Sequence, residues 1–260
     1  MVFDYYPGCT LKTEARELDE AGRRSAAALG IELQELDAWQ CCGAVYPLGR
    51  DEIAPRLSSV RALAAARDHR RDLLTLCSAC HHVIKRVNHD IRTDEKIRDT
   101  ANSYMEGEQA YQGETKVVHY LEMLRDTLGF DELKNRIKKP LTGMKIGAYY
   151  GCLLLRPGKV MSFDNPENPS IMESFITALG AEPVIYPYRN ECCGGYITVK
   201  EKDQAARTAS RVIDSALEHG ADCLITACPL CLYNIDVNGT SSKDLPVYYI
   251  TQLLAQALDV

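Results

Sequence analysis

The pattern of apolar and polar positions predicts one series of strands and helices written twice along the chain. Apolar and aromatic runs ending in a turn open the two copies, "VFDYYPGCT" at residues 2–10 and "KIGAYYGCL" at residues 145–153, as strands do. A helix with apolar residues at helical spacing follows each run. Both helices end at "ALG", where Gly30 and Gly180 suit the left-handed C-cap position. The helical positions are Leu18, Ala21, Ser25, Ala28 and Leu29, and Ile171, Phe175, Ala178 and Leu179.

The rest of each copy continues in the same order. Strand candidates at 31–37 and 181–187 are followed by amphipathic helices at roughly 52–69 and 204–219. Apolar strands at 73–80 and 223–231 come next, and each copy ends with a strand that enters a helix, at 117–124 and 246–254. Alternation of strands and helices predicts right-handed crossovers and mainly parallel sheets. We therefore expect an α/β fold of two pseudo-twofold-related domains, each with a small, mainly parallel sheet flanked by helices.

The boundary between the copies falls near "KNRIKKPLTG", a charged stretch with Pro140 and Gly143, which predicts domains at 1–143 and 144–260. Two segments break the repeat. A charged, helix-like insert spans 86–115, and the mixed charges of 85–99 indicate either a solvated helix face or a surface for a docking protein. The polar loop "SFDNPENPS", residues 162–170, is expected to be a surface excursion near the second site.

Composition narrows the classes of function. The 260 residues, 46% of them hydrophobic, can bury the core of one large domain or two smaller ones. The net charge of −6 and the lack of a basic stripe argue against nucleic acid as a partner. Without a signal peptide or an apolar run of about 18 residues, we expect a cytoplasmic protein without membrane insertion. In that reducing compartment, eleven cysteines favour metal binding or redox chemistry over a disulfide framework.

Ten of the eleven cysteines form two groups of five in the same order, with the last three intervals identical. The intervening lengths are 31, none, 34 and 2 residues in the first copy and 39, none, 34 and 2 in the second. Every one follows a predicted strand, so all are expected at the carboxyl edge of a sheet, where α/β folds build their sites. The sequence thus predicts one five-thiol site per domain, made by Cys9, Cys41, Cys42, Cys77 and Cys80, and by Cys152, Cys192, Cys193, Cys228 and Cys231.

A glycine follows each adjacent pair of cysteines, Gly43 in the first copy and Gly194 in the second. Neighbouring side chains of an extended strand point in opposite directions, so an adjacent pair can face one centre only from a turn. Glycine permits such a turn, because it adopts positive φ or lets the backbone approach a bound group closely.

Several bound groups are compatible with five thiols. A structural zinc takes four ligands, so one thiol would be left over. An iron–sulfur cluster suits all-cysteine ligation better, although an ordinary cubane also takes four. Five thiols indicate a larger or irregular cluster, or one cysteine that acts without binding the metal directly. Zinc and redox-active thiols stay open as alternatives at this point.

The repeated C…CCG…CxxC pattern resembles the CCG domain of the B subunit of heterodisulfide reductase, over nearly the whole chain and with both copies complete. The resemblance implies that the five cysteines of each motif hold a non-cubane 4Fe–4S cluster, so that the chain carries two. It implies a disulfide substrate between the clusters, with each sulfur meeting one cluster iron, and cleavage or formation of the disulfide in one-electron steps.

Other CCG proteins suggest an alternative. The domain also occurs in glycolate- and lactate-oxidising systems and in other electron-transfer complexes, sulfur-oxidising ones among them, where it would relay electrons without disulfide chemistry. The last CxxC is commonly degraded in the lactate systems, whereas "CSAC" and "CPLC" are both intact here. The chain has no tandem ferredoxin motif. The resemblance therefore implies partners that carry the relay, namely a small ferredoxin-like C subunit, with a flavin-containing A subunit beyond it.

Charged residues near the cysteines are candidates for contact with substrate. Arg156 and Lys159 follow Cys152, and they could bind an anionic end of a substrate by charge-assisted hydrogen bonds or simply begin a solvated loop. His81 and His82 follow Cys80. They are candidate proton donors, with an exposed helix N-terminus as the alternative.

Two further residues distinguish the second copy. Gly195 follows Gly194 where Ala44 stands in the first copy, which suggests more room beside the second cluster. We therefore expect the second cluster to be the one that meets substrate. Cys223 has no counterpart in the first copy, and it is expected to be an inert thiol within a strand.

Overall fold

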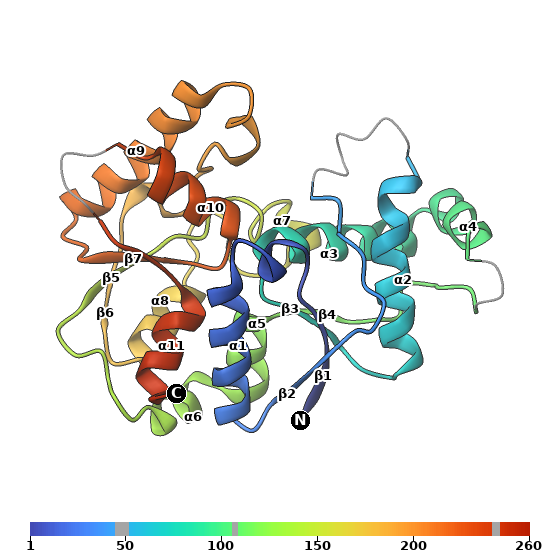
Figure 1. The fold of residues 1–260 in the computed structure, drawn as a ribbon, viewed down its shortest axis with the longest axis horizontal. Helices are drawn as coiled ribbons and strands as arrows, with labels where there is room; N and C mark the ends of the chain where they lie inside the picture. Colours follow the sequence, from blue (N-terminus) through green and yellow to red (C-terminus); the bar gives the residue numbers. More distant parts are fainter. Residues whose placement is uncertain (45–51, 106–108, 241–244) are drawn as a thin grey trace.

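The computed structural model describes residues 1–44, 52–105, 109–240 and 245–260, and it contains two four-stranded parallel sheets (Figure 1). The first has the order β2-β1-β3-β4 and the second the equivalent order β6-β5-β7-β8. The predicted α/β repeat is thus confirmed. The first sheet comprises β1 (Val2–Tyr6), β2 (Glu32–Glu35), β3 (Leu73–Thr75) and β4 (Val117–His119); the second comprises β5 (Lys145–Ala148), β6 (Glu182–Val184), β7 (Cys223–Thr226) and β8 (Val247–Tyr249).

Helices connect and flank the strands of both sheets. The first half has α1 (Arg16–Ala28), α2 (Ala54–Asp68), α3 (Ser78–Thr93), α4 (Glu95–Ser103), α5 (Tyr120–Glu122), a π-helical turn (Met123–Leu128) and α6 (Phe130–Arg136). The second has α7 (Gly158–Met161), α8 (Ile171–Ala178), α9 (Lys202–Glu218), α10 (Pro229–Tyr233), a π-helical turn (Asn234–Asn238) and α11 (Ile250–Leu258). Gly30 and Gly180 end α1 and α8 with φ of +74° and +81°, as predicted from "ALG".

Helices of each half pack against helices of the other half across their boundary. In Figure 1, α1 of the first half lies beside α11 of the second. The reciprocal contact places α8 of the second half against α5 and α6 of the first. The Thr251 hydroxyl donates to the Leu18 carbonyl at 3.1 Å, and one hydrophobic core runs through both halves. This shared core holds the two halves in a fixed relative position. The domain boundaries at 1–143 and 144–260 stay a prediction.

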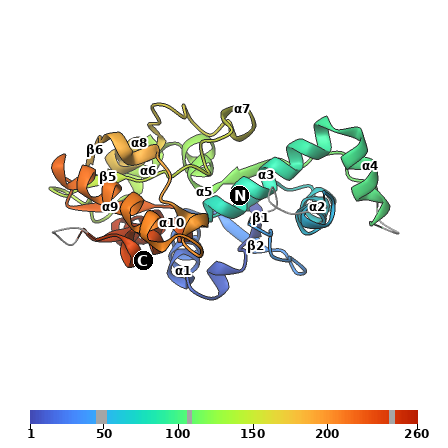
Figure 2. The ribbon, with the colours of Figure 1, turned by 90° about the horizontal axis from the view of Figure 1, so that it is seen from above.

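The charged insert is helical over its first part. It holds the end of α3 and all of α4, which extend away from the second half in Figure 2. The side chains of Val87 and Ile91 are fully buried, whereas most charged side chains of the stretch face outward. Arg56 of α2 holds this arm to the body through Asp90, at 2.8 Å. The stretch thus presents a charged outer helix face, and its use as a docking surface stays a prediction.

No helix in the part of the chain that the structure describes combines the length and the apolar character needed to cross a bilayer.

Burial of His119 is expected to make the stability of the fold depend on pH. The ring of His119 packs edge-on against His81 and Phe163, and its Nε2 lies 3.0 Å from the Leu76 carbonyl. Burial lowers the pKa of His119 to about 3, whereas an unfolded chain takes up this proton near pH 6.5. As the pH falls below about 6.5, protonation favours the unfolded chain. The free energy of unfolding should then decrease by up to about 1.4 kcal/mol per pH unit from this group until the pH nears 3.

Urea denaturation between pH 7 and pH 4.5 measures this contribution. The stability of wild type relative to His119→Gln should decline as the pH falls, because the variant lacks the group that titrates. His89→Gln, at an exposed position of α3, serves as the control and should keep the wild-type dependence. Parallel pH profiles of wild type and His119→Gln would contradict the assignment.

Candidate functional site

The cysteines of the first half lie together as a string of neighbouring thiols, called here the first set. The Sγ atoms of Cys41 and Cys9 are 3.4 Å apart, and those of Cys42 and Cys80 are 3.5 Å apart. Cys41 and Cys80 also hydrogen-bond with Cys42 and Cys77, respectively. All five predicted residues are therefore in one place, and none forms a disulfide.

The second set repeats this arrangement with the equivalent residues. Cys193 and Cys231 are 3.7 Å apart between their Sγ atoms, and Cys231 hydrogen-bonds with Cys228. Cys192 hydrogen-bonds with Cys152 and with Cys193. The pairing order in the two sets is the same, so the repeat in sequence spacing corresponds to a repeat in space.

Strand order explains why the sets form there. β1 lies between β2 and β3, and β5 lies between β6 and β7, so the chain reverses its direction of winding at the central strand. α/β folds bind ligands beyond the carboxyl ends of strands at such a switch point. Cys9 and Cys77 follow β1 and β3, and the second set uses β5 and β7 in the same way.

Both glycines of the CCG motifs have positive φ, as predicted. The φ angles are +81° at Gly43 and +80° at Gly194. The turn at Gly194 also points its N–H at the Cys192 sulfur, at 3.3 Å. This turn allows both cysteines of the pair to join the same set.

Another pair of glycines makes room for sulfur and was not recognised in the sequence. Gly8 and Gly151 precede the first cysteine of each set, with φ of +77° and +61°. A Cβ atom on Gly8 would lie 2.6 Å from the Cys80 Sγ, and one on Gly151 would lie 2.9 Å from the Cys231 Sγ. These contacts are too close for any residue with a Cβ atom. The signal was the repeated dipeptide Gly-Cys in both copies.

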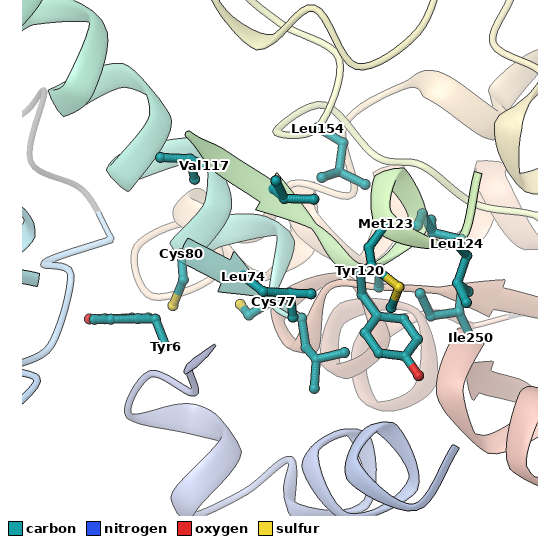
Figure 3. Packing of buried hydrophobic residues seen from close by; sticks show 14 of the residues in the cluster. Tyr6, Leu74, Cys77, Cys80, Val117, Tyr120, Met123, Leu124, Leu154 and Ile250 are labelled. Carbon is teal, nitrogen blue, oxygen red and sulfur yellow. The ribbon is translucent and has the colours of Figure 1, made fainter. Parts of the chain in front are cut away.

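Two buried tyrosines hold the CCG loops, and these too were missed. The hydroxyl of Tyr6 donates to the carbonyl of Gln40, directly before Cys41. The hydroxyl of Tyr149 donates to the carbonyl of Glu191, directly before Cys192, at 2.9 Å. In Figure 3 the Tyr6 ring lies beside the Cys80 sulfur at one end of the core. The sequence signal was the pattern Y-x-G-C, present as "YPGC" and "YYGC".

Replacing either tyrosine with phenylalanine should loosen one loop only. Tyr6→Phe and Tyr149→Phe each remove one hydrogen bond, worth about 0.5–1.5 kcal/mol. We expect bound iron to leave the altered half about two- to tenfold faster when a chelator is added. The unaltered half is an internal control, and Tyr120→Phe controls for loss of a buried hydroxyl, which there hydrogen-bonds with Ser25. Uniform release from both halves would contradict this role.

Hydrogen bonds between thiols shift the pKa values in opposite directions along the first set. The pKa of Cys42 falls to about 3, because its thiolate accepts from Cys41 and Cys80. The pKa values of Cys41 and Cys80 rise, chiefly because each donates to Cys42. Neighbouring thiols therefore do not all ionise unaided. A cation would have to neutralise the set for all five to bind as thiolates.

The second set alternates in the same way. The pKa of Cys192 falls to about 2, chiefly through a hydrogen bond from Cys152, whose own pKa rises for the same reason. The pKa of Cys193 rises to about 12, because it hydrogen-bonds with the Cys192 thiolate. The pKa of Cys228 is held low by Cys231, whose own pKa is raised.

The donor chemistry fits a metal–sulfur group. Thiolates that share one tetrahedral metal, with bonds of about 2.3 Å, are about 3.8 Å apart. The measured Sγ–Sγ distances of 3.4, 3.5 and 3.7 Å are near this value. Among the residues described, no group of three or more His, Cys, Asp or Glu side chains is arranged to hold a metal ion. Each set is a string of pairs, so binding a metal would have to gather further thiols around it.

Contacts to main-chain carbonyls join the two sets across the boundary between the halves. The N–H of Ser78, next to Cys77, donates to the carbonyl of Ala227, next to Cys228, at 3.0 Å. His82 Nδ1 lies 2.9 Å from the carbonyl of Leu153, the residue after Cys152. The CxxC segments of the two halves therefore abut.

The two candidate histidines are buried rather than at an exposed helix N-terminus. His81 is fully buried, with Nδ1 at 3.0 Å from the Thr75 hydroxyl and Nε2 at 3.5 Å from Glu122. His82 exposes 6% of its surface and faces the Leu153 carbonyl. Burial lowers the pKa of both rings. Neither ring forms a hydrogen bond with a cysteine sulfur in the described part of the chain, and proton donation stays a prediction.

Arg156 contacts the loop at 162–170, which does lie near the second set. Its guanidinium donates to the carbonyls of Asn190 and Pro166, at 2.8 and 3.2 Å, and lies 3.3 Å from Glu167. Asn190 is two residues before Cys192, so Arg156 helps to fix the segment that leads into the second cysteine pair. Lys159 is exposed on α7. Anion binding by these two residues stays a prediction.

The structure gives Gly195 a role different from the one expected. A Cβ atom there would lie 2.6 Å from Leu230 Cδ2 and 3.4 Å from the Cys193 Sγ. The glycine therefore allows Leu230 to pack closely and does not leave open space beside the second set. Cys223 lies in β7, buried and outside both sets, and burial raises its pKa to about 11.

Comparison with known proteins shows which family the chain belongs to. The cysteine-rich domain named CCG matches the chain twice, over residues 3–85 and 146–236. The chain belongs to the CCG cysteine-rich domain family. The predicted repeat is thus confirmed, and each match contains one complete set of five cysteines.

Relatives of known name align over nearly the full chain. The 8-methylmenaquinol:fumarate reductase membrane anchor subunit of Wolinella succinogenes is 33% identical, over 99% of this chain and 92% of its own length. The B subunit of the ferredoxin:CoB-CoM heterodisulfide reductase of Methanosarcina mazei is 27% identical, over 96% and 87%. A protein of Archaeoglobus profundus, named as similar to the B subunit of heterodisulfide reductase, is 26% identical, over 97% and 89%. The predicted resemblance to this subunit is confirmed.

A solved structure shares the fold. A hypothetical protein from Helicobacter pylori superposes with a TM-score of 0.77 at 12% sequence identity. The match covers 99% of this chain and 49% of that one, so this chain corresponds to about half of its length.

Proposed function

We propose that this CCG protein is the catalytic iron–sulfur subunit of a heterodisulfide reductase-like complex. It would reduce or form a disulfide held between two non-cubane 4Fe–4S clusters, one per half, in one-electron steps. The observation that carries the proposal is that both five-thiol sets are complete, equivalent and joined across the halves by the Ser78–Ala227 and His82–Leu153 contacts.

The broader part of the proposal depends on the relatives. They are named as subunits of a fumarate reductase and of heterodisulfide reductases, and they align with 99% and 96% of this chain. The chain is accordingly an electron-transferring oxidoreductase subunit of the iron–sulfur kind. Partners that supply or accept electrons follow from this, and we propose a ferredoxin-like C subunit together with a flavin-containing A subunit.

In this function, residues of the chain would bind the clusters, orient the loops that carry the cysteine pairs and contact the substrate. The ten cysteines would hold the clusters, which when bound would supply one electron each to the substrate sulfurs. Tyr6 and Tyr149 would fix the loops that carry the cysteine pairs. Lys159, and Arg156 at the edge of the 162–170 loop, would meet an anionic end of the substrate. His81 and His82, both buried, would be the candidates for proton transfer.

Electron relay without disulfide chemistry is the second candidate. It is favoured by the relative at 33% identity, whose name places it in an 8-methylmenaquinol:fumarate reductase. In that role the same ten cysteines would hold the same groups, but no organic sulfur compound would contact them.

Binding of thiols and disulfides separates the two functions. Anaerobically purified protein is oxidised and titrated with each class of compound while its paramagnetic signal is recorded. A disulfide-active site should change the signal in a saturable way, because a substrate sulfur alters the surroundings of iron. A signal that no thiol or disulfide changes would reject disulfide chemistry and leave the relay.

A further inference from the structure

One side chain links the two CCG loops directly. The hydroxyl of Tyr196 donates to the carbonyl of Ala44 at 3.1 Å. Ala44 lies two residues after Cys42, and Tyr196 lies three residues after Cys193. The bond therefore runs from the loop of the second set to the loop of the first.

Electrostatic interactions indicate that the same phenol lies near both sets. Burial of the hydroxyl raises the pKa of Tyr196, and coulombic interaction with four cysteines raises it further: Cys228 and Cys152 of the second set and Cys42 and Cys77 of the first. Coulombic interaction weakens with distance, so a group that feels both sets lies near both. Tyr196 still exposes 41% of its surface. It is therefore partly exposed to solvent and lies near both sets.

The other links between the sets differ in kind. Ser78 and His82 contact main-chain carbonyls of the second half, and they expose 1% and 6% of their surface. Those links hold the halves together inside the core. Tyr196 is partly exposed, and its link to Ala44 depends on one hydrogen bond that is open to competition from water. Tyr196 belongs to neither hydrophobic core cluster, so displacement of its ring is expected to leave the core intact and to make nearby thiols more accessible.

We propose that Tyr196 is a specificity-determining residue that closes the solvent side of the space between the two thiol sets. A compound that reaches both sets has to displace the ring or pass beside it, so the ring selects against bulky groups next to the reacting sulfur. That this compound is a thiol or disulfide rests on the proposed function. The closure itself does not.

Alkylation of the full chain without bound clusters tests the closure alone. The rate at each cysteine is measured by mass spectrometry with a small reagent, iodoacetamide, and a bulky one, a polymer-linked maleimide. Tyr196→Ala should accelerate the bulky reagent by about tenfold or more at thiols that the ring shields. We expect these to be Cys42, Cys77 and Cys228, which interact electrostatically with Tyr196 and are each at most 4% exposed. Cys9 and Cys41 are already exposed and should react as in wild type.

Two further variants separate the ring from its hydrogen bond. Tyr196→Phe keeps the ring and loses one hydrogen bond, so acceleration should be only about two- to tenfold. Tyr233→Ala removes another exposed tyrosine, two residues after Cys231, and should change nothing. Equal rates in wild type and Tyr196→Ala would overturn the proposal. If Tyr196→Ala does not fold, unchanged rates in Tyr196→Phe would overturn it.

Titration of the cluster-loaded protein tests the choice of ligand. The half-saturating concentrations of a small thiol, 2-mercaptoethanol, and a bulky one, glutathione, are compared through the paramagnetic signal. Tyr196→Ala should reduce the ratio of bulky to small by about tenfold, while Tyr233→Ala should keep it. An unchanged ratio would overturn selection by size. If neither thiol changes the signal of wild type, the proposed disulfide chemistry fails, and the alkylation rates still decide whether Tyr196 closes the space.

Discussion

Replacing Cys193 with alanine is expected to halve the iron and acid-labile sulfide of the anaerobically purified protein. Two 4Fe–4S clusters would give wild type about eight irons and eight sulfides per chain, and the variant about four of each. The reason is position: Cys193 is buried in the second set, 3.7 Å from Cys231, while the first set lies in the other half. Cys42→Ala should give the same result through the first set.

Metal and sulfide analysis with Cys223→Ala as the control makes this test specific. Cys223 is a buried cysteine in β7 outside both sets, so its loss should leave all of the iron in place. Two zincs and no sulfide in wild type would reject the iron–sulfur assignment. Complete loss of iron in Cys193→Ala, with the fold intact, would reject the independence of the two sites.

Gly8→Ala is expected to abolish iron binding at the first set while sparing the second. The new Cβ would lie 2.6 Å from the Cys80 Sγ, so either the sulfur or the loop after β1 must move. Gly151→Ala should do the reverse, since its Cβ would lie 2.9 Å from the Cys231 Sγ. Each variant should therefore retain about half of the iron and sulfide of wild type.

Gly8→Ala would also strain the backbone at a positive φ, so a control has to distinguish this strain from displacement of the Cys80 sulfur. Gly30 has φ of +74°, close to the +77° of Gly8, and a Cβ atom there would meet nothing within 4 Å. Gly30→Ala and Gly8→Ala should thus share a loss of about 1 kcal/mol in the free energy of unfolding, but only Gly8→Ala should lose iron. Equal iron content in the two variants would contradict the steric explanation.

Local patterns predicted the elements and the cysteine sets well. Strand and helix alternation, the C-cap glycines at 30 and 180 and the turns at Gly43 and Gly194 all depend on neighbouring residues, and the structure confirms them. The matching order of the cysteines and the repeated intervals of 34 and 2 residues were enough to predict two equivalent sites, because strands of a parallel sheet end at one edge.

Contacts between distant segments had no local signature. Nothing near His81 or His82 in sequence indicates that Leu153 and Glu122 cover them. Gly195 was interpreted as open space, because its neighbour Leu230 is 35 residues away in sequence and invisible to a local pattern. The tyrosines at 6 and 149 were visible as repeats, but their hydrogen bonds depend on how each sheet brings two loops together.

The packing of α11 of the second half on α1 of the first has a consequence for when the clusters can be inserted. α1 ends at Ala28, whereas α11, which packs on it, begins only at Ile250. Because the Thr251 hydroxyl of α11 bonds the Leu18 carbonyl of α1, the covering of α1 is completed only after α11 has been synthesised. All ten cysteines of the two sets precede α11 in the chain. We therefore expect the clusters to be inserted after both halves have been synthesised, rather than one half at a time.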